Sequence, residues 1–176
     1  MRWEALFADL ESQLGAAEAR SRASDVADLT RAERASVHLS DRLRAAVGSE
    51  IRVSLRSGVV RGVLVDVGTA WLLISDGGRE HLVPLAAIGA IADLGDASAP
   101  APGVAVRRLG LGHVLRAIAR DRTVVLMSHA AGRAAGRIDV VGADHLDLAV
   151  VYPDSGRPTG ERETVPFAAL DLVSSA

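Results

Sequence analysis

An internal repeat is the feature that most constrains the fold of this chain. Residues 51–91 and residues 123–173 carry the same order of glycines, aliphatic positions and a Val-Pro step. Two copies are too few for a solenoid, which needs three or more units, so the repeat predicts a tandem duplication. The matched positions are Gly58, Gly62, Leu64, Val67-Gly68, Leu72, Ile74 and 83–88 in copy one, and Gly132, Gly136, Ile138, Val141-Gly142, Leu146, Leu148 and 165–170 in copy two.

Each copy predicts five short strands, because it is rich in β-branched residues and its turns fall at glycine. The turn at 75–78, Ser-Asp-Gly-Gly, is typical of a tight hairpin. Pro84 and Pro166 cannot donate to a ladder, so each should end a strand. Five short, bent strands bury little as a flat sheet, so we expect each copy to close into a small barrel. The strands of copy one are expected at about 50–56, 59–67, 69–75, 79–83 and 88–92.

A spaced glycine pattern carries a family resemblance. It runs Val53-x-Leu55-x-x-Gly58-x-x-x-Gly62-x-Leu64-x-x-Val67-Gly68, then Trp71-Leu72-Leu73-Ile74, with a short strand expected after Val83-Pro84-Leu85. Over more than half of its length the chain thereby resembles the Sm-like family, which implies tandem five-stranded barrels, each preceded by a helix. The Asn-containing loop and the basic element near the last strands of RNA-binding members are absent, and the chain has no Asn.

The first strands of the two copies align with Val53 and Leu55 opposite Val125 and Met127, which requires two extra residues before Gly132. On the next two strands, alternation places Val63, Val65, Trp71 and Leu73 outside the barrel, where copy two is polar. We expect this apolar face to be covered by the other barrel, the N-terminal helices or a second subunit. The alternative is a strand bend that turns these residues into their own core.

The domain boundaries follow composition and periodicity. We expect an N-terminal helical segment at 1–37 and the first Sm-like barrel with its leading helix at 38–93. A linker rich in Pro, Gly, Ala and Ser covers 94–105, and the second barrel with its leading helix covers 106–176. Helices are expected through residue 47, with a stop at Gly48, and again at about 106–120. The fold class predicted is therefore α+β.

The N-terminal segment carries one apolar stripe at helical spacing. Its two readings are a coiled-coil or partner helix, and a helix packed back on its own barrel. Neither of these two readings is preferred. The stripe and the apolar face of the first barrel are both candidate protein interfaces. The stripe consists of Trp3, Leu6, Phe7, Leu10 and Leu14.

Arginines gather in the helix expected before the second barrel. Formal net charge is -2, so the chain has no global basic surplus for binding phosphates. Locally the arginines face one acid, Asp121, and could contact nucleic acid, RNA or DNA. A solvated helix face is the alternative, and we favour it. The candidate nucleic-acid contacts are Arg107, Arg108, Arg116, Arg120 and Arg122.

No catalytic constellation is found in the sequence. The chain lacks cysteine, a Gly-x-Ser-x-Gly elbow and a P-loop. Asp144-His145-x-Asp147 is the one His/carboxylate cluster, and a solvated turn explains it better than a metal site. We therefore expect no enzyme, no cofactor and no metal. No apolar run suits a membrane and no signal peptide is recognised, so a cytoplasmic protein is expected.

These observations favour a non-enzymatic assembly or adaptor protein that works by protein–protein interaction or self-association. The runner-up is a nucleic-acid-binding regulator that uses the arginine-rich helix. A weaker third reading is a small-ligand sensor with a groove between the barrels.

Overall fold

The computed structural model describes residues 31, 35–99 and 110–176. Residues 1–38 and 39–176 form two separate compact units, and the fold below is that of the second. The apolar stripe from Trp3 to Leu14 lies outside the described residues, as do Arg107 and Arg108.

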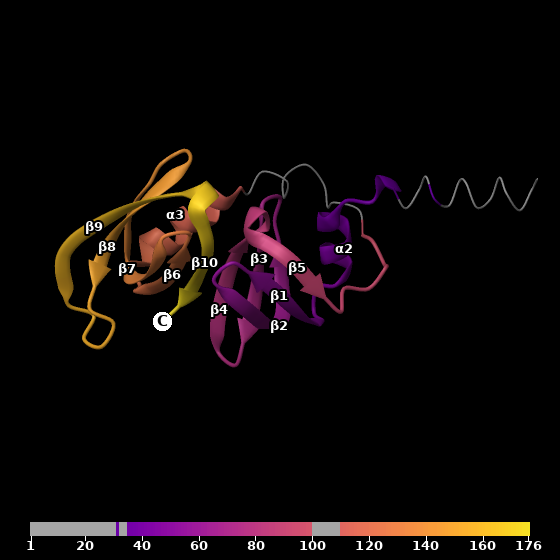
Figure 1. Ribbon diagram of the computed structural model, residues 1–176, viewed down its shortest axis with the longest axis horizontal. Helices are drawn as coiled ribbons and strands as arrows, with labels where there is room; N and C mark the ends of the chain where they lie inside the picture. The colour runs from indigo at the N-terminus through magenta and orange to yellow at the C-terminus, as the bar shows by residue number, and fades with distance from the viewer. Residues whose placement is uncertain (1–30, 32–34, 100–109) are drawn as a thin grey trace, which may run out of the picture. The chain divides into compact units, whose positions relative to one another are not determined.

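The elements follow one another in the same order in both repeats (Figure 1). We call residues 39–92 repeat one and residues 111–175 repeat two. Repeat one comprises α2 (Leu39–Ala45), β1 (Glu50–Leu55), β2 (Gly58–Val67), β3 (Trp71–Asp76), β4 (Arg79–Pro84), the 3-10 turn η1 (Leu85–Ala87) and β5 (Ile88–Ala92). Repeat two comprises α3 (Leu111–Asp121), β6 (Val125–His129), β7 (Gly132–Val141), β8 (His145–Val151), β9 (Pro158–Pro166), η3 (Phe167–Ala169) and β10 (Leu170–Ser175).

The five strand positions predicted for copy one are confirmed to within two residues. The hairpin turn is Gly77-Gly78, and both glycines have positive φ. Gly48, in the turn that follows α2, has a φ of 88°. Pro84 and Pro166 are the last residues of β4 and β9, where the missing N–H costs no ladder bond. These local features follow from side-chain period and turn chemistry.

The prediction of two closed barrels in an α+β fold is wrong. The described strands form one open antiparallel sheet of ten strands, in the order β5-β1-β2-β3-β4-β10-β6-β7-β8-β9, with two short helices, α2 and α3, in the same unit. Closure would need β4 to pair with β5 of its own repeat. Instead β5 returns to β1, and β4 pairs with β10 of the other repeat. Two residues of β4, His81 and Leu82, therefore pair with the other repeat in place of a strand of their own repeat.

Bulges and glycines bend the strands at equivalent places. The ladder shifts register at Val65 in β2 and at Asp139 in β7. Gly62 and Gly136 let the neighbouring strand approach closely: a Cβ at Gly136 would lie 2.6 Å from the carbonyl oxygen of Ala149. This close approach explains why both copies carry glycine there.

The structural match between the repeats corrects the sequence alignment of the first strands. Leu55 pairs with Gly58 across the β1–β2 turn, as His129 pairs with Gly132 across the β6–β7 turn. The two turns have the same length, so the two extra residues expected in copy two do not exist. His129 therefore corresponds to Leu55, and two positions in the first strand change partners.

Two hydrophobic clusters form the core, and residues of both repeats contribute to each. The cluster of repeat two contains Trp71 and Leu82 from repeat one, and Leu172 packs against the cluster of repeat one. Burying a large apolar side chain stabilises a fold by about 1.5–3 kcal/mol. The contact between the repeats is therefore part of the core.

Candidate functional site

The β4–β10 contact, which we call the seam, joins the repeats through a short ladder. Val173 pairs with Leu82 and Ser174 with His81. Nδ1 of His81 lies 2.8 Å from Oγ of Ser174, and the backbone N–H of Glu80 donates to Oγ of Ser175 at 3.0 Å. Burial lowers the pKa of His81 below its usual value, which favours the neutral ring.

A buried carboxylate strengthens the seam. Asp171 of β10 has a side chain that is 1% exposed, and it accepts bonds from Nε and Nη2 of Arg56 at 3.1 and 2.8 Å. Arg56 lies in the β1–β2 turn, so the pair links the two repeats. Such charge-assisted bonds are stronger than neutral ones and fix geometry. Arg133 of repeat two also donates to the carbonyl oxygen of Ser57, at 2.6 Å.

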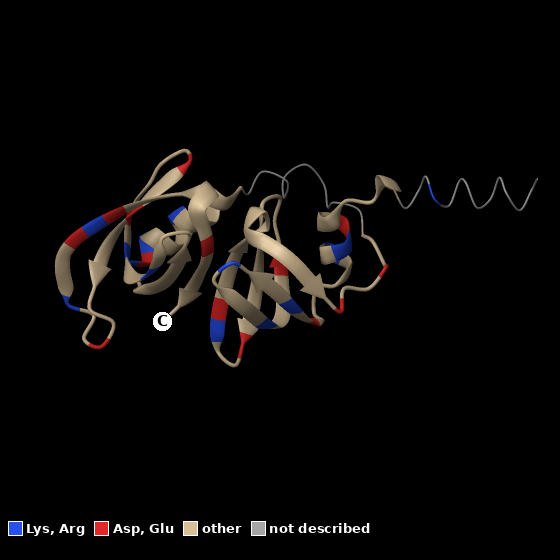
Figure 2. Ribbon diagram, in the orientation of Figure 1, with Lys and Arg blue, Asp and Glu red and all other residues tan. Residues whose placement is uncertain are grey.

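The two ends of the described sheet are β5 and β9. Each has one neighbouring strand, so each presents unpaired backbone groups along one edge. Acidic and basic residues alternate along β9 (Figure 2), as Glu161, Arg162 and Glu163. Arg162 pairs with Asp139 at 2.9 Å on the face opposite Glu163. Strand β5, by contrast, carries only small and aliphatic residues.

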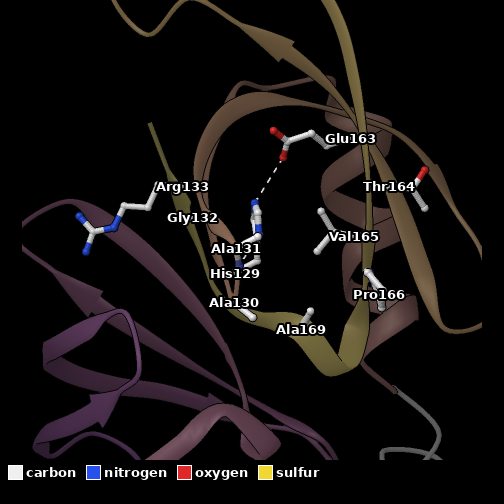
Figure 3. A pocket seen from close by; sticks show the side chains of 10 residues that line it. All are labelled: His129, Ala130, Ala131, Gly132, Arg133, Glu163, Thr164, Val165, Pro166 and Ala169. Atoms are coloured by element: carbon white, nitrogen blue, oxygen red, sulfur yellow. Dashed lines mark hydrogen bonds and ion pairs between the residues drawn. The ribbon is translucent and has the colours of Figure 1, made fainter.

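A pocket of about 440 Å³ lies beside the free edge of β9, between that strand and the β6–β7 turn (Figure 3). His129 and Glu163 both line it and lie next to each other, with Nε2 of the histidine 3.3 Å from Oε2 of the carboxylate. Both atoms are buried and neither forms a hydrogen bond within the described residues. The N–H of Ala131 donates to Nδ1 of His129 at 3.3 Å, which places a neutral ring's proton on Nε2.

The equivalent surface of repeat one is filled. There the β1–β2 turn and β4 form the walls, and strand β10 contacts both: it pairs with β4 at the seam and binds Arg56 of the turn. In the pocket of repeat two, Ala130 takes the position of Arg56, and Glu163 takes that of His81. We call this pocket the β9 groove. It is the open counterpart of a surface that, in the same chain, binds a strand.

A second cavity, of about 620 Å³, lies at the seam between β3 and β4 of repeat one and α3 and β10 of repeat two. Its walls include Leu73, Leu82 and Val173, with Arg122 and Arg137 among the polar residues. Its volume lies within the range of small-molecule sites. Nothing in its charges selects one ligand class, because Glu80 and Asp121 balance the arginines.

The residues of the apolar face expected on the first repeat differ in burial. Trp71 is 5% exposed, and Leu73 packs with it against the core of repeat two. Val63 and Val65 are both 43% exposed. Both valines lie on β2, which β3 separates from the seam strand β4.

The Trp71 ring also lies over Gly68, and the His145 ring lies over Gly142 in the same way. A Cβ on either glycine would overlap the ring three residues later. The Val-Gly pair that marks both copies therefore makes room for a ring, a role that sequence spacing alone does not reveal.

The three described arginines of the candidate nucleic-acid helix are Arg116, Arg120 and Arg122. Arg116 donates to the carbonyl oxygen of Gly142 at 3.2 Å, and Arg120 and Arg122 are exposed at the end of α3. Nucleic-acid binding stays a prediction.

The members of the Asp144-His145-x-Asp147 cluster have different hydrogen-bond partners. Nδ1 of His145 lies 2.9 Å from Asp144, and this hydrogen bond lowers the pKa of the Asp144 carboxyl. Asp147 instead accepts a bond from Thr164 at 2.6 Å. Within the described ranges no group of three or more potential ligands is placed to hold a metal ion.

Comparison with known proteins finds neither a matching family model nor a matching curated protein. Among the helices of the described residues, none has the length and apolarity needed to cross a bilayer. Sequence reasoning missed Asp171, His129 and Glu163. The signal for Asp171 was present, since it is an acid within the apolar strand Leu-Asp-Leu-Val, where copy one has Gly89.

Proposed function

We propose that this protein is a non-enzymatic assembly or adaptor protein that binds protein partners through the free edges of its sheet. The observation that supports this proposal best is the seam, where an edge strand of one repeat binds an edge strand of the other. After that pairing, β5 and β9 keep one unpaired edge each among the described strands. Unpaired edges are templates for adding a strand from another chain.

The proposal covers both a second copy and a different protein as partner, since either can supply a strand. It rests on the edges and does not depend on the resemblance to Sm-like proteins, which stays a prediction. The N-terminal stripe from Trp3 to Leu14 remains a candidate interface within the same proposal.

Sedimentation velocity across a range of concentrations, together with edge variants, tests this function. Ala90→Lys on β5 and Glu161→Lys on β9 place a cation at an exposed edge position, and natural proteins block strand addition in this way. Val140→Lys is the matched control, because Val140 is exposed on β7, which has a neighbour on each side.

Assembly or partner binding that is lost in the edge variants and kept in the control supports the proposal. A wild-type chain that stays monomeric, and whose partners bind the edge variants equally well, contradicts it. Salt-sensitive binding of single-stranded RNA or duplex DNA that disappears when Arg116 and Arg120 are replaced by alanine would favour the nucleic-acid reading instead.

A further inference from the structure

The β9 groove and the seam differ in charge at equivalent positions. In the seam, Arg56 binds Asp171 and His81 meets Ser174, three residues further along the bound strand. In the β9 groove Ala130 stands at the position of Arg56, and the carboxylate of Glu163 stands at that of the imidazole. Arg133, which also lines the groove, donates to the carbonyl oxygen of Ser57. The two surfaces are therefore built from equivalent elements and differ in the charged side chains that they offer to a strand.

Glu163 is placed to meet the side chain of an added strand. Ser174 faces His81 across the seam, so a strand bound to β9 in the same register has its corresponding residue opposite Glu163. The Glu163 side chain keeps 41% of its surface exposed, whereas His129 opposite is 12% exposed. The Glu163 side chain is thus partly exposed, while its Oε2 is buried beside a histidine with which it forms no hydrogen bond.

We infer that the β9 groove binds an extended segment of another protein, antiparallel to β9, with a basic side chain opposite Glu163. The inference rests on the proposed function and names the partner class. A small residue three positions before the basic one fits the groove, since Ala130 offers no cation to a carboxylate there. Backbone pairing supplies affinity in strand addition, and alternate side chains supply specificity.

A second copy of this chain satisfies the groove less well. In the seam register β5 brings Ala92 opposite Glu163 and Gly89 near Ala130, because these residues correspond to Ser174 and Asp171 of β10. None of the polar contacts of the seam is then reproduced. Charge complementarity therefore favours a basic segment from a different protein.

Labelled peptides and the full chain test this inference by fluorescence anisotropy. The first peptide has the sequence of residues 168–176 with Asp171→Ala and Ser174→Lys, the second is unsubstituted, and the third has the sequence of residues 86–94 around β5. We expect the first to bind about tenfold more tightly than either of the others, the effect of one partly desolvated charge pair.

Two variants locate the binding site. Glu163→Gln should remove the preference for lysine, while Asp154→Asn, the same loss of charge in the exposed turn after β8, should leave it unchanged. Ala130→Arg restores the seam's cation, so it should raise the affinity of the peptide that keeps Asp171. This gain requires a folded groove, which separates a local effect from loss of structure.

Three outcomes would overturn the inference. They are tighter binding of the β5 peptide, a lysine preference that persists in Glu163→Gln, and absence of binding by the first peptide at about 1 mM. The first outcome identifies a second copy as the occupant and leaves the proposed function standing. The proposed function itself fails only if the edge variants also leave assembly and partner binding unchanged.

Discussion

The ion pair between Arg56 and Asp171 gives the sharpest test of how the repeats are held together. The two charges differ in environment: Asp171 is 1% exposed, while the Arg56 side chain keeps 59% of its surface in solvent. Removing one partner of a fully buried ion pair costs about 3–5 kcal/mol, because the other charge is left buried and unpaired. Solvent at Arg56 screens part of this effect, so we expect Arg56→Ala to lower the free energy of unfolding by about 2 kcal/mol.

The chain offers a closely matched control. Arg162 pairs with Asp139 at 2.9 Å and is 61% exposed, so its distance and its own exposure resemble those of Arg56. Its carboxylate partner, however, is 40% exposed. Exposed pairs contribute about 0.2–1 kcal/mol, so Arg162→Ala should cost less than about 1 kcal/mol. The difference between the two variants isolates the burial of the carboxylate.

A double-mutant cycle with Asp171→Asn completes this test. Asn keeps the shape and an acceptor but removes the charge, so the single variant should cost about 1 kcal/mol. In its background the cost of Arg56→Ala should fall by about 1 kcal/mol, since no carboxylate is left unpaired.

Urea unfolding followed by tryptophan emission and circular dichroism measures these values. The chain has two tryptophans, Trp3 and Trp71, so a Trp3→Phe background leaves Trp71 at the seam as the reporter. If Arg56→Ala costs no more than about 0.5 kcal/mol, the pair behaves as an exposed one and the reasoning is refuted.

Three further predictions concern the glycines, the seam histidine and the exposed face. Gly68→Ala should destabilise the fold by about 1–3 kcal/mol, because the buried Trp71 ring cannot move aside. Gly142→Ala should cost less, because the His145 ring above it is half-exposed. Thermal unfolding of both variants measures the difference. Burial lowers the pKa of His81, so around and below pH 6.5 the unfolded chain binds more protons than the folded one. Stability should therefore fall as the pH drops through that value, and the fall should be smaller in His81→Gln, as measured by urea midpoints at several pH values. Val65→Ser should change stability by less than about 0.5 kcal/mol, and a larger loss in the same assay would mean that the residue is covered.

Periodicity and turn chemistry predicted much of the local structure. The alternation placed Leu64, Leu72 and Ile74 inside, and all three are fully buried. Glycine and proline placed the turns, because their backbone limits act within a few residues. The first-strand alignment failed because apolar residues are interchangeable there, and only the ladder shows that His129 occupies the position of Leu55.

The candidate site was only partly visible in the sequence. The Trp71 face suggested a covered surface, and the structure places Trp71 and Leu73 against repeat two while Val63 and Val65 remain exposed. No periodicity indicated the groove that His129 and Glu163 line, since the two residues belong to segments that meet only through the fold.

The sequence by itself determined that this chain contains one β-rich unit twice, placed the strands of the first copy to within two residues, and placed Leu64, Leu72 and Ile74 inside. Only the tertiary structure decided that β4 pairs with β10 and that the sheet stays open, with β5 and β9 at its ends. The physical reason is that strand pairing is made by backbone groups, which are the same at every residue except proline. A sequence therefore encodes the faces of a sheet far more clearly than the partners of its edges.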